Sequence, residues 1–200
     1  PGKRERRGRR AGRERGRGLR IFSHFLSSSR TPRITGGAPK LAGMTVPSAL
    51  AVSAVDPAGG LLATDLLAFG ALGIAGSGLV TAVTADGLRL PGPIQEVPVA
   101  LVRAGLDAAL SARRFTAVKI GIVPSAPAVR AIARGLARVP APRVLHPGFA
   151  PQTEVRLVRS AALDAFVRDL FPGAALVVLG QKEASVLAGF PIREETDVKA

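Results

Sequence analysis

The stretch ALAVSAVDPAGGLLATDLLAFGALGIAGSGLVTAVTADG, residues 49–87, decides the fold that the sequence predicts. It opens with an uncharged, mostly apolar run over residues 49–54, of the kind that a parallel sheet buries on both faces. The pentapeptide Asp-Pro-Ala-Gly-Gly at 56–60 interrupts this run, because proline fixes φ and glycine accepts the positive φ of a sharp turn. Apolar residues at helical spacing over 61–69 and a run rich in β-branched residues over 79–84 follow. The stretch therefore predicts a strand, a turn, a helix and a second strand.

The rest of the chain repeats this alternation of strands and helices. We predict a loop at residues 87–95, strands at 117–122, 143–146 and 174–179, and helices at 98–111, 126–137, 160–170 and 181–187. Such repeated units predict an α/β domain with three layers, in which an open, mostly parallel sheet has helices on both faces. Ligands of such sheets bind at the carboxyl ends of the strands. At that edge, the N–H groups of the turn at 56–60 and the dipole of the next helix favour an anionic or polar small ligand.

Several short motifs follow one another in unbroken order between residue 49 and the end of the chain. They are Asp56-Pro57-Ala58-Gly59-Gly60, Asp65-Leu66 with Phe69, Leu72-Gly73 with Gly76, Val80-Thr81-Ala82-Val83-Thr84-Ala85, Val118-Lys119-Ile120-Gly121, Leu145-His146-Pro147 and Glu183-Ala184. In this order they resemble the motifs of the hydroxymethylpyrimidine/phosphomethylpyrimidine kinases, the thiamine-biosynthesis members of the ribokinase-like fold. The resemblance implies a phosphotransferase with ATP and Mg²⁺ as cofactors and a small pyrimidine as substrate. It also implies that residues 44–200 form a ribokinase-like domain that is incomplete at its C-terminal end.

The resemblance assigns four residues to the substrate. Asp65 matches an aspartate that hydrogen-bonds the pyrimidine in the family, although the path from Asp56 to Asp65 has ten residues where the family has eleven. Asp86 stands in place of a glutamine that contacts the ring, and a carboxylate accepts hydrogen bonds but cannot donate them. Ala54 replaces a glycine and adds a methyl where the substrate is expected, and Ile122 replaces a methionine as a wall of the pocket.

The nucleotide side departs further from the family. Glu183 matches a glutamate that holds Mg²⁺ through water, but Gly180 stands where the family has an asparagine. Lys119 is interpreted either as facing a phosphate or as a solvated charge on a strand, and His146 replaces an acidic residue. The family's C-terminal G-T-G-C/D motif, which supplies the anion hole and the catalytic residue, does not occur in the sequence. We therefore assign no catalytic residue and expect little or no phosphoryl transfer from these 200 residues.

Most of the positive charge lies in the first 43 residues. The chain has a formal net charge of +14, and residues 1–43 contain 13 Lys/Arg against 2 Asp/Glu. This Arg/Gly-rich segment has no sustained apolar periodicity, so we expect it to be a disordered tail. The only methionine is Met44, which predicts that translation starts there, downstream of the tail. Nucleic-acid binding is expected only through residues 1–43.

The composition indicates which cellular compartment and which kinds of site to expect. Cysteine is absent, which excludes disulfides and thiolate metal sites and fits a cytoplasmic protein. Residues 66–85 carry no charge over a length that could span a bilayer. Four glycines and a change from Leu/Ala to Val/Thr within this segment predict a helix followed by a strand instead, so no membrane partner is expected. A homodimer is left open.

Three functions stay open from the sequence. The first is a truncated or diverged pyrimidine kinase of thiamine biosynthesis. The second is a relative that kept the fold as a non-catalytic pyrimidine-binding or scaffolding protein. The third is an RNA-binding protein that acts through the basic tail.

Overall fold

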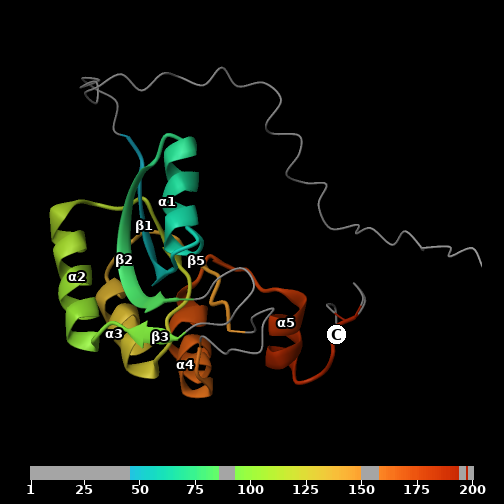
Figure 1. Ribbon diagram of the computed structural model, residues 1–200. Coiled ribbons are helices and arrows are strands. Elements are labelled where there is room, and N and C mark those ends of the chain that lie inside the picture. The colour runs from blue at the N-terminus through green and yellow to red at the C-terminus, as the bar shows by residue number, and fades with distance from the viewer. Residues whose placement is uncertain (1–45, 86–92, 150–157, 194–196, 198–200) are drawn as a thin grey trace, which may run out of the picture. The chain divides into compact units, whose positions relative to one another are not determined.

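The computed structural model describes residues 46–85, 93–149, 158–193 and 197, and Figure 1 shows how their helices and strands are arranged. These residues form a six-stranded sheet with the strand order β3-β2-β1-β4-β5-β6. The strands are β1 (Ser48–Val55), β2 (Ala75–Thr84), β3 (Ile94–Glu96), β4 (Ala117–Ile120), β5 (Arg143–Leu145) and β6 (Leu176–Val177). Neighbouring strands are parallel except for the pair β2 and β3. The predicted open, mostly parallel sheet is confirmed.

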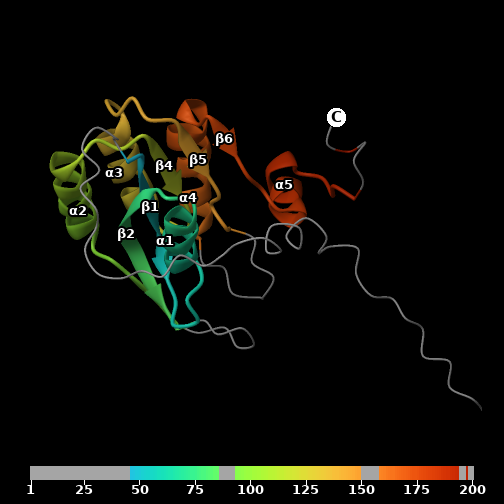
Figure 2. The same cartoon turned by 90° about the horizontal axis from the view of Figure 1, so that it is seen from above.

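Helices cover both faces of this sheet. The described helices are α1 (Leu62–Ala71), α2 (Val99–Ala112), α3 (Ala126–Leu136), α4 (Ser160–Ala165) and α5 (Gln181–Ala188), of which α1 to α4 cover the sheet; a π-helical turn (Phe166–Leu170) and a 3₁₀ turn (Phe171–Gly173) continue α4. α1 lies against β1 and β2 on one face, whereas α2, α3 and α4 pack side by side on the other (Figure 2). The predicted three-layer α/β architecture is therefore also confirmed.

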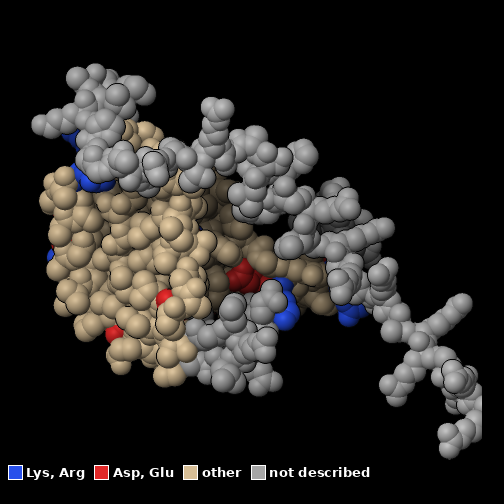
Figure 3. All heavy atoms as spheres, turned by 45° about the horizontal axis from the view of Figure 1, so that its top comes forward, with Lys and Arg blue, Asp and Glu red and all other residues tan. Residues whose placement is uncertain are grey.

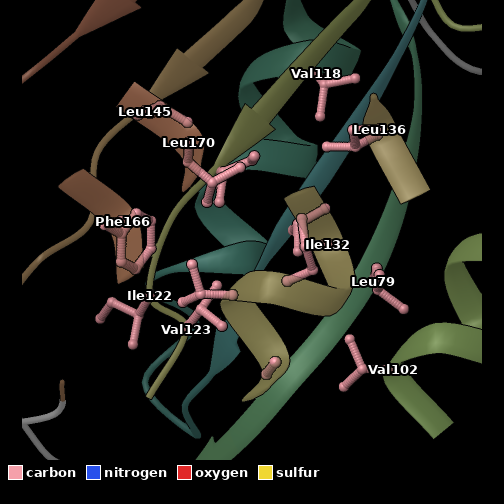
Figure 4. Packing of buried hydrophobic residues seen from close by; sticks show 14 of the residues in the cluster. Leu79, Val102, Val118, Ile122, Val123, Ile132, Leu136, Leu145, Phe166 and Leu170 are labelled. Carbon is pink, nitrogen blue, oxygen red and sulfur yellow. The ribbon is translucent and has the colours of Figure 1, made fainter. Parts of the chain in front are cut away.

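The main hydrophobic core lies between the sheet and the layer of α2, α3 and α4. Leu50, Val52 and Ala54 of β1 contribute to it, because alternate residues of a strand point to the same face. Ile132 of α3 and Phe166 after α4, both labelled in Figure 4, contribute to the same cluster from the helical side. All five side chains are 0% exposed, and burying one of the larger ones stabilises the fold by about 1.5–3 kcal/mol.

Small residues on β2 let α1 approach the opposite face of the sheet closely. A Cβ on Gly76 would stand 3.1 Å from a methyl carbon of Leu66, and one on Gly78 would stand 3.2 Å from a methyl carbon of Leu62. These glycines lie in the part of β2 that was not predicted, since β2 begins at Ala75, four residues before the predicted start at residue 79. The sequence pattern missed these residues because glycine and serine carry no strand signal of their own.

Two further elements differ from the prediction. Ile94 and Gln95, predicted as the end of a loop, belong to the antiparallel edge strand β3, which is too short for an alternating pattern to reveal. The helix predicted over 160–170 changes from α-helical to π-helical geometry at Phe166. Phe166 and Leu170, at the two ends of the π-helical turn, are both fully buried in the core.

Charged groups are sparse on the described surface that Figure 3 shows. This agrees with the composition of residues 44–200, which contain 15 Lys/Arg and 12 Asp/Glu. Among the described helices, none is long and apolar enough to cross a membrane. Residues 1–43, which the sequence predicts to be a disordered tail, lie outside the described residues.

Candidate functional site

The Asp-Pro-Ala-Gly-Gly turn after β1 is held together by its own aspartate. Asp56 Oδ1 accepts hydrogen bonds from the N–H groups of Ala58, at 2.8 Å, and Gly60, at 3.3 Å. Gly59 adopts a φ of 78°, which a residue with a Cβ would adopt only with strain. Two of the N–H groups predicted to face a ligand are therefore already bonded within the turn. The aspartate of this motif therefore stabilises the turn through hydrogen bonds within it.

The entry into α1 is strained at one residue. Leu61 has φ 52° and ψ −119°, and it is the one non-glycine residue with positive φ among the described residues. Such a conformation costs on the order of 1–3 kcal/mol for a residue with a side chain. Leu61 lies on the ten-residue path between Asp56 and Asp65, where the family's path is one residue longer. This strained residue also lines the pocket described next.

A pocket of about 230 Å³ opens where β1, β4 and β5 end and α1 begins. Its lining residues come from the carboxyl edge of the parallel sheet and from the first turn of α1. They are Ser53, Leu61, Thr64, Asp65, Lys119, Gly121, Ile122, His146 and Gly148. The pocket lies at the edge of the sheet where the strand–helix pattern predicts a ligand site.

An ion pair lies in this pocket. Lys119 Nζ donates to Asp65 Oδ2 at 2.6 Å, and the two side chains are 21% and 18% exposed. Asp65 comes from α1 and Lys119 from β4, so 54 residues of sequence separate the partners. Because Lys119 is one residue from the buried Val118 and Ile120, it points to the face of the sheet that α1 covers.

Two buried hydroxyls fix the main chain at Ile122. Ser53 Oγ accepts a hydrogen bond from the Ile122 N–H at 3.1 Å, and Thr81 Oγ1 donates to the Ile122 carbonyl oxygen at 2.6 Å. Ser53 and Thr81 are each 1% exposed. Neither residue was predicted as a site residue, because its one local signal is a hydroxyl within an otherwise apolar strand.

The structure brings together three of the residues predicted for the site. Asp65, Lys119 and Ile122 line one pocket, and His146 joins them there. Ala54 does not: its methyl is 0% exposed in the core on the other face of the sheet, and its neighbour Ser53 faces the pocket instead. The expectation that this methyl enters the substrate space is therefore corrected, because successive residues of a strand point to opposite faces. Asp86 lies outside the described residues.

Glu183 has a structural role at the start of α5. It is 5% exposed, and its Oε2 accepts a hydrogen bond from the Gly180 N–H at 2.8 Å. This arrangement satisfies a free N–H group at the helix N-terminus and places a negative charge at the positive end of the helix dipole. No group of three or more acidic or histidine side chains able to hold a metal ion occurs in the described part of the chain. The Glu183 carboxylate, which is engaged in this cap, does not by itself fit a Mg²⁺ site, because Mg²⁺ requires several oxygen ligands.

Comparison with known proteins places this chain in a family. The family described as phosphomethylpyrimidine kinase matches residues 56–200. A hydroxymethylpyrimidine/phosphomethylpyrimidine kinase of Rhizobium meliloti is 34% identical over 142 residues, which cover 70% of this chain and 53% of that protein. One of Streptomyces coelicolor is 33% identical over 157 residues, covering 78% of this chain and 58% of that protein. The chain thus spans little more than half the length of these curated relatives.

A further relative supports the same family, and a solved structure has the same fold. A probable thiamine biosynthetic bifunctional enzyme of Oryza sativa is 32% identical over 170 residues, covering 84% of this chain and 31% of that protein. The crystal structure of phosphomethylpyrimidine kinase from Clostridium difficile 630 superposes with a TM-score of 0.70 at 24% identity, covering 76% of this chain and 67% of that one. The chain therefore belongs to the phosphomethylpyrimidine kinase family of thiamine biosynthesis and has its ribokinase-like fold.

Proposed function

We propose that this chain binds a small pyrimidine, hydroxymethylpyrimidine or its phosphate, in the pocket beside Asp65. The observation that carries the proposal is that Asp65, the match to the family's pyrimidine-binding aspartate, lines a pocket at the ligand-binding edge of the sheet. The volume of about 230 Å³ lies somewhat below the roughly 300–1,000 Å³ typical of ligand pockets. It therefore suits one small ring.

The chemistry of the lining supports a polar heterocycle. Leu61 and Ile122 supply apolar walls, which favour the faces of a flat ring. Asp65 supplies a carboxylate acceptor, and Lys119 supplies ammonium donors. A few polar groups between apolar walls are the usual means by which a pocket orients a small ligand.

We further infer that these 200 residues do not complete phosphoryl transfer from ATP. ATP and Mg²⁺ are the cofactors that the family implies, yet Glu183 caps its own helix and the Lys119 ammonium is paired with Asp65. The sequence also lacks the G-T-G-C/D anion hole. Losing one contact of this type lowers a rate by about 10²–10³, and several are missing together.

Calorimetry with hydroxymethylpyrimidine tests the binding site. We expect Asp65→Ala to weaken binding by roughly tenfold or more, because a charged hydrogen-bond acceptor contributes about 1.5–3 kcal/mol. Asp107→Ala, which removes an exposed carboxylate from α2, is the matched control and should leave the affinity unchanged. Equal affinities for the wild type and Asp65→Ala would rule out the proposed contact.

A second assay tests the inference about catalysis. The chain is incubated with hydroxymethylpyrimidine, ATP and Mg²⁺, and phosphorylated product is compared with a control that lacks the protein. We expect no product above the control. A clear excess of product would contradict this inference while leaving the binding proposal intact.

The helix-capping role of Glu183 also favours a second candidate, a non-catalytic pyrimidine-binding relative. The two candidates are separated by fusing the C-terminal part of the Rhizobium meliloti kinase to this chain. Turnover in the fusion would identify the chain as the pyrimidine-binding part of a kinase. Binding without turnover in a folded fusion would favour the non-catalytic relative.

A further inference from the structure

The described lining of the pocket contains two nitrogen bases and one carboxylate. The bases are Lys119, on β4, and His146, directly after β5, and the carboxylate is that of Asp65 on α1. Asp65 and Lys119 bond to each other at 2.6 Å, so their charges offset one another. The imidazole of His146 is exposed and makes no hydrogen bond or ion pair with another described residue. It is therefore the ionisable group of the described lining whose nitrogen atoms are left for a ligand.

The main chain around His146 is well defined by its contacts. The His146 N–H donates to the Ile120 carbonyl oxygen at 2.8 Å, which extends the pairing of β4 and β5 by one residue. Pro147 follows, is buried, and restricts the backbone of both residues. Because Leu145 points into the core, the next residue points to the opposite face of the sheet, which Lys119 also faces. The imidazole thus lies on the same face of the sheet as the ion pair.

The small size of the pocket brings these groups within reach of one ligand. A volume of about 230 Å³ corresponds to a sphere roughly 8 Å across, close to the Debye length of about 8 Å at physiological ionic strength. Salt therefore screens the interaction between His146 and a charged ligand in the pocket only in part. A ring beside Asp65 leaves its substituent near the other lining groups.

We propose that His146 binds the phosphate group of a pyrimidine phosphate ester, so that the pocket prefers this ester to the free alcohol. The inference deepens the proposed function and rests on it for the identity of the ring. Both nitrogen atoms of a protonated imidazole donate hydrogen bonds, and phosphate oxygens accept them in charge-assisted form. Because histidine changes its charge near neutral pH, a bound phosphate dianion favours protonation of the ring. The neutral hydroxyl of the alcohol gains no such charge–charge attraction.

Calorimetry at neutral pH tests this preference by comparing hydroxymethylpyrimidine with its phosphate ester. In the wild type the ester should bind more tightly than the alcohol. His146→Gln should lower the ratio of ester to alcohol affinity by about three- to tenfold, less than for a buried contact because the imidazole is exposed. His146→Asp should lower the ratio further, because a carboxylate repels the phosphate. His146→Arg, which supplies a permanent cation, should return the ratio toward the wild-type value.

Arg113→Gln is the matched control, because it also replaces an exposed basic side chain with an amide. Arg113 follows α2 and does not line the pocket, so the ratio should stay the same. Circular dichroism establishes that each variant is folded.

Nitrogen NMR of the imidazole gives a second readout that a merely structural role would not move. The chain has two histidines, and the signals of His146 are identified by their absence in His146→Gln. The ester should move these signals toward those of a protonated ring, whereas the alcohol should not.

A ratio that falls in His146→Gln and His146→Asp and recovers in His146→Arg supports the proposal. A ratio that falls in Lys119→Met but not in His146→Gln would assign the phosphate to the lysine and overturn it. The proposal is also overturned if the wild type binds the ester no more tightly than the alcohol. In these two cases binding of the alcohol leaves the proposed function standing. A wild type that binds neither ligand overturns the proposed function, and the preference for the ester falls with it.

Discussion

At the scale of residues, glycine has different roles at two positions, of which only Gly121 lines the pocket. Gly121 lies at the end of β4 in close contact with its neighbours, and a Cβ there would meet Ser53 Oγ at 2.4 Å and Ser53 Cβ at 2.9 Å. Gly70 lies within α1, and a Cβ there would meet nothing within 4 Å. The two sites therefore predict opposite responses to the same added methyl.

We expect Gly121→Ala to destabilise the fold by about 1–3 kcal/mol, because the methyl overpacks a buried site. Gly70→Ala should stabilise it by about 0.5–1 kcal/mol, because alanine loses less backbone entropy in a helix. Urea unfolding of both variants and the wild type measures these changes. A Gly121→Ala variant as stable as the wild type would show that Ser53 and Lys119 move aside at little cost.

At the scale of elements, β2 carries two buried threonines with different hydrogen bonding. Thr81 Oγ1 donates to the Ile122 carbonyl oxygen, so it ties β2 to the segment after β4. Thr84 is 2% exposed, and its hydroxyl has no hydrogen-bond partner among the described residues. The same substitution at both positions therefore distinguishes a bonded hydroxyl from an unbonded one.

Thr81→Val should lower the free energy of unfolding by about 1–3 kcal/mol, because it leaves a buried carbonyl without its donor. Thr84→Val should be neutral or stabilise by up to about 1 kcal/mol, because it replaces an unbonded buried hydroxyl with a methyl group. Chemical denaturation of the two variants side by side measures both changes. Equal losses would mean that threonine packing, and not the hydrogen bond, determines the cost.

The π-helical turn after α4 contributes a dependence on pH. The Arg168 guanidinium donates two hydrogen bonds of 2.9 Å to the Asp169 carboxylate and holds the pKa of that carboxyl below its ordinary value of 3.8. Because the folded state lowers this pKa, the associated stability is present above about pH 4. It is lost as the pH falls through the lower folded-state value. Its size is small, since the pair is exposed.

Asp169→Asn tests this contribution. The variant should be slightly less stable than the wild type at pH 6, and the difference should shrink as the pH falls below 4. Thermal unfolding between pH 3 and pH 7 measures it. A difference that grew toward acid pH would contradict the assigned sign.

For the whole molecule, the described core uses residues from Ser48 onward. We therefore expect a chain that begins at Met44 to unfold at the same temperature as the 200-residue chain and to bind hydroxymethylpyrimidine equally well. Differential scanning calorimetry and ligand titration measure both properties. RNA binding in an electrophoretic mobility assay, if the full chain shows it, should disappear with residues 1–43. A shortened chain that fails to fold would show that the tail contributes to the core.

The alternation of strands and helices was predictable because each element carries a local pattern. The runs over residues 49–54 and 117–122 are apolar enough for a parallel sheet buried on both faces, and the turn residues at 56–60 interrupt the first run. The family motifs followed in the same way, and so did the carboxyl edge of the sheet as the place where the pocket lies. Elements without a local pattern, such as β3 and the start of β2, were not predicted.

The sequence by itself determined the fold class, the family and the edge of the sheet where the pocket lies, because these depend on patterns within a few neighbouring residues. Only the tertiary structure decided which side chains enter the pocket. β1 is buried on both faces, so its composition does not show that Ser53 faces the pocket and Ala54 the core. The pairing of Lys119 with Asp65 likewise depends on how β4 and α1 pack, since the two residues are 54 positions apart.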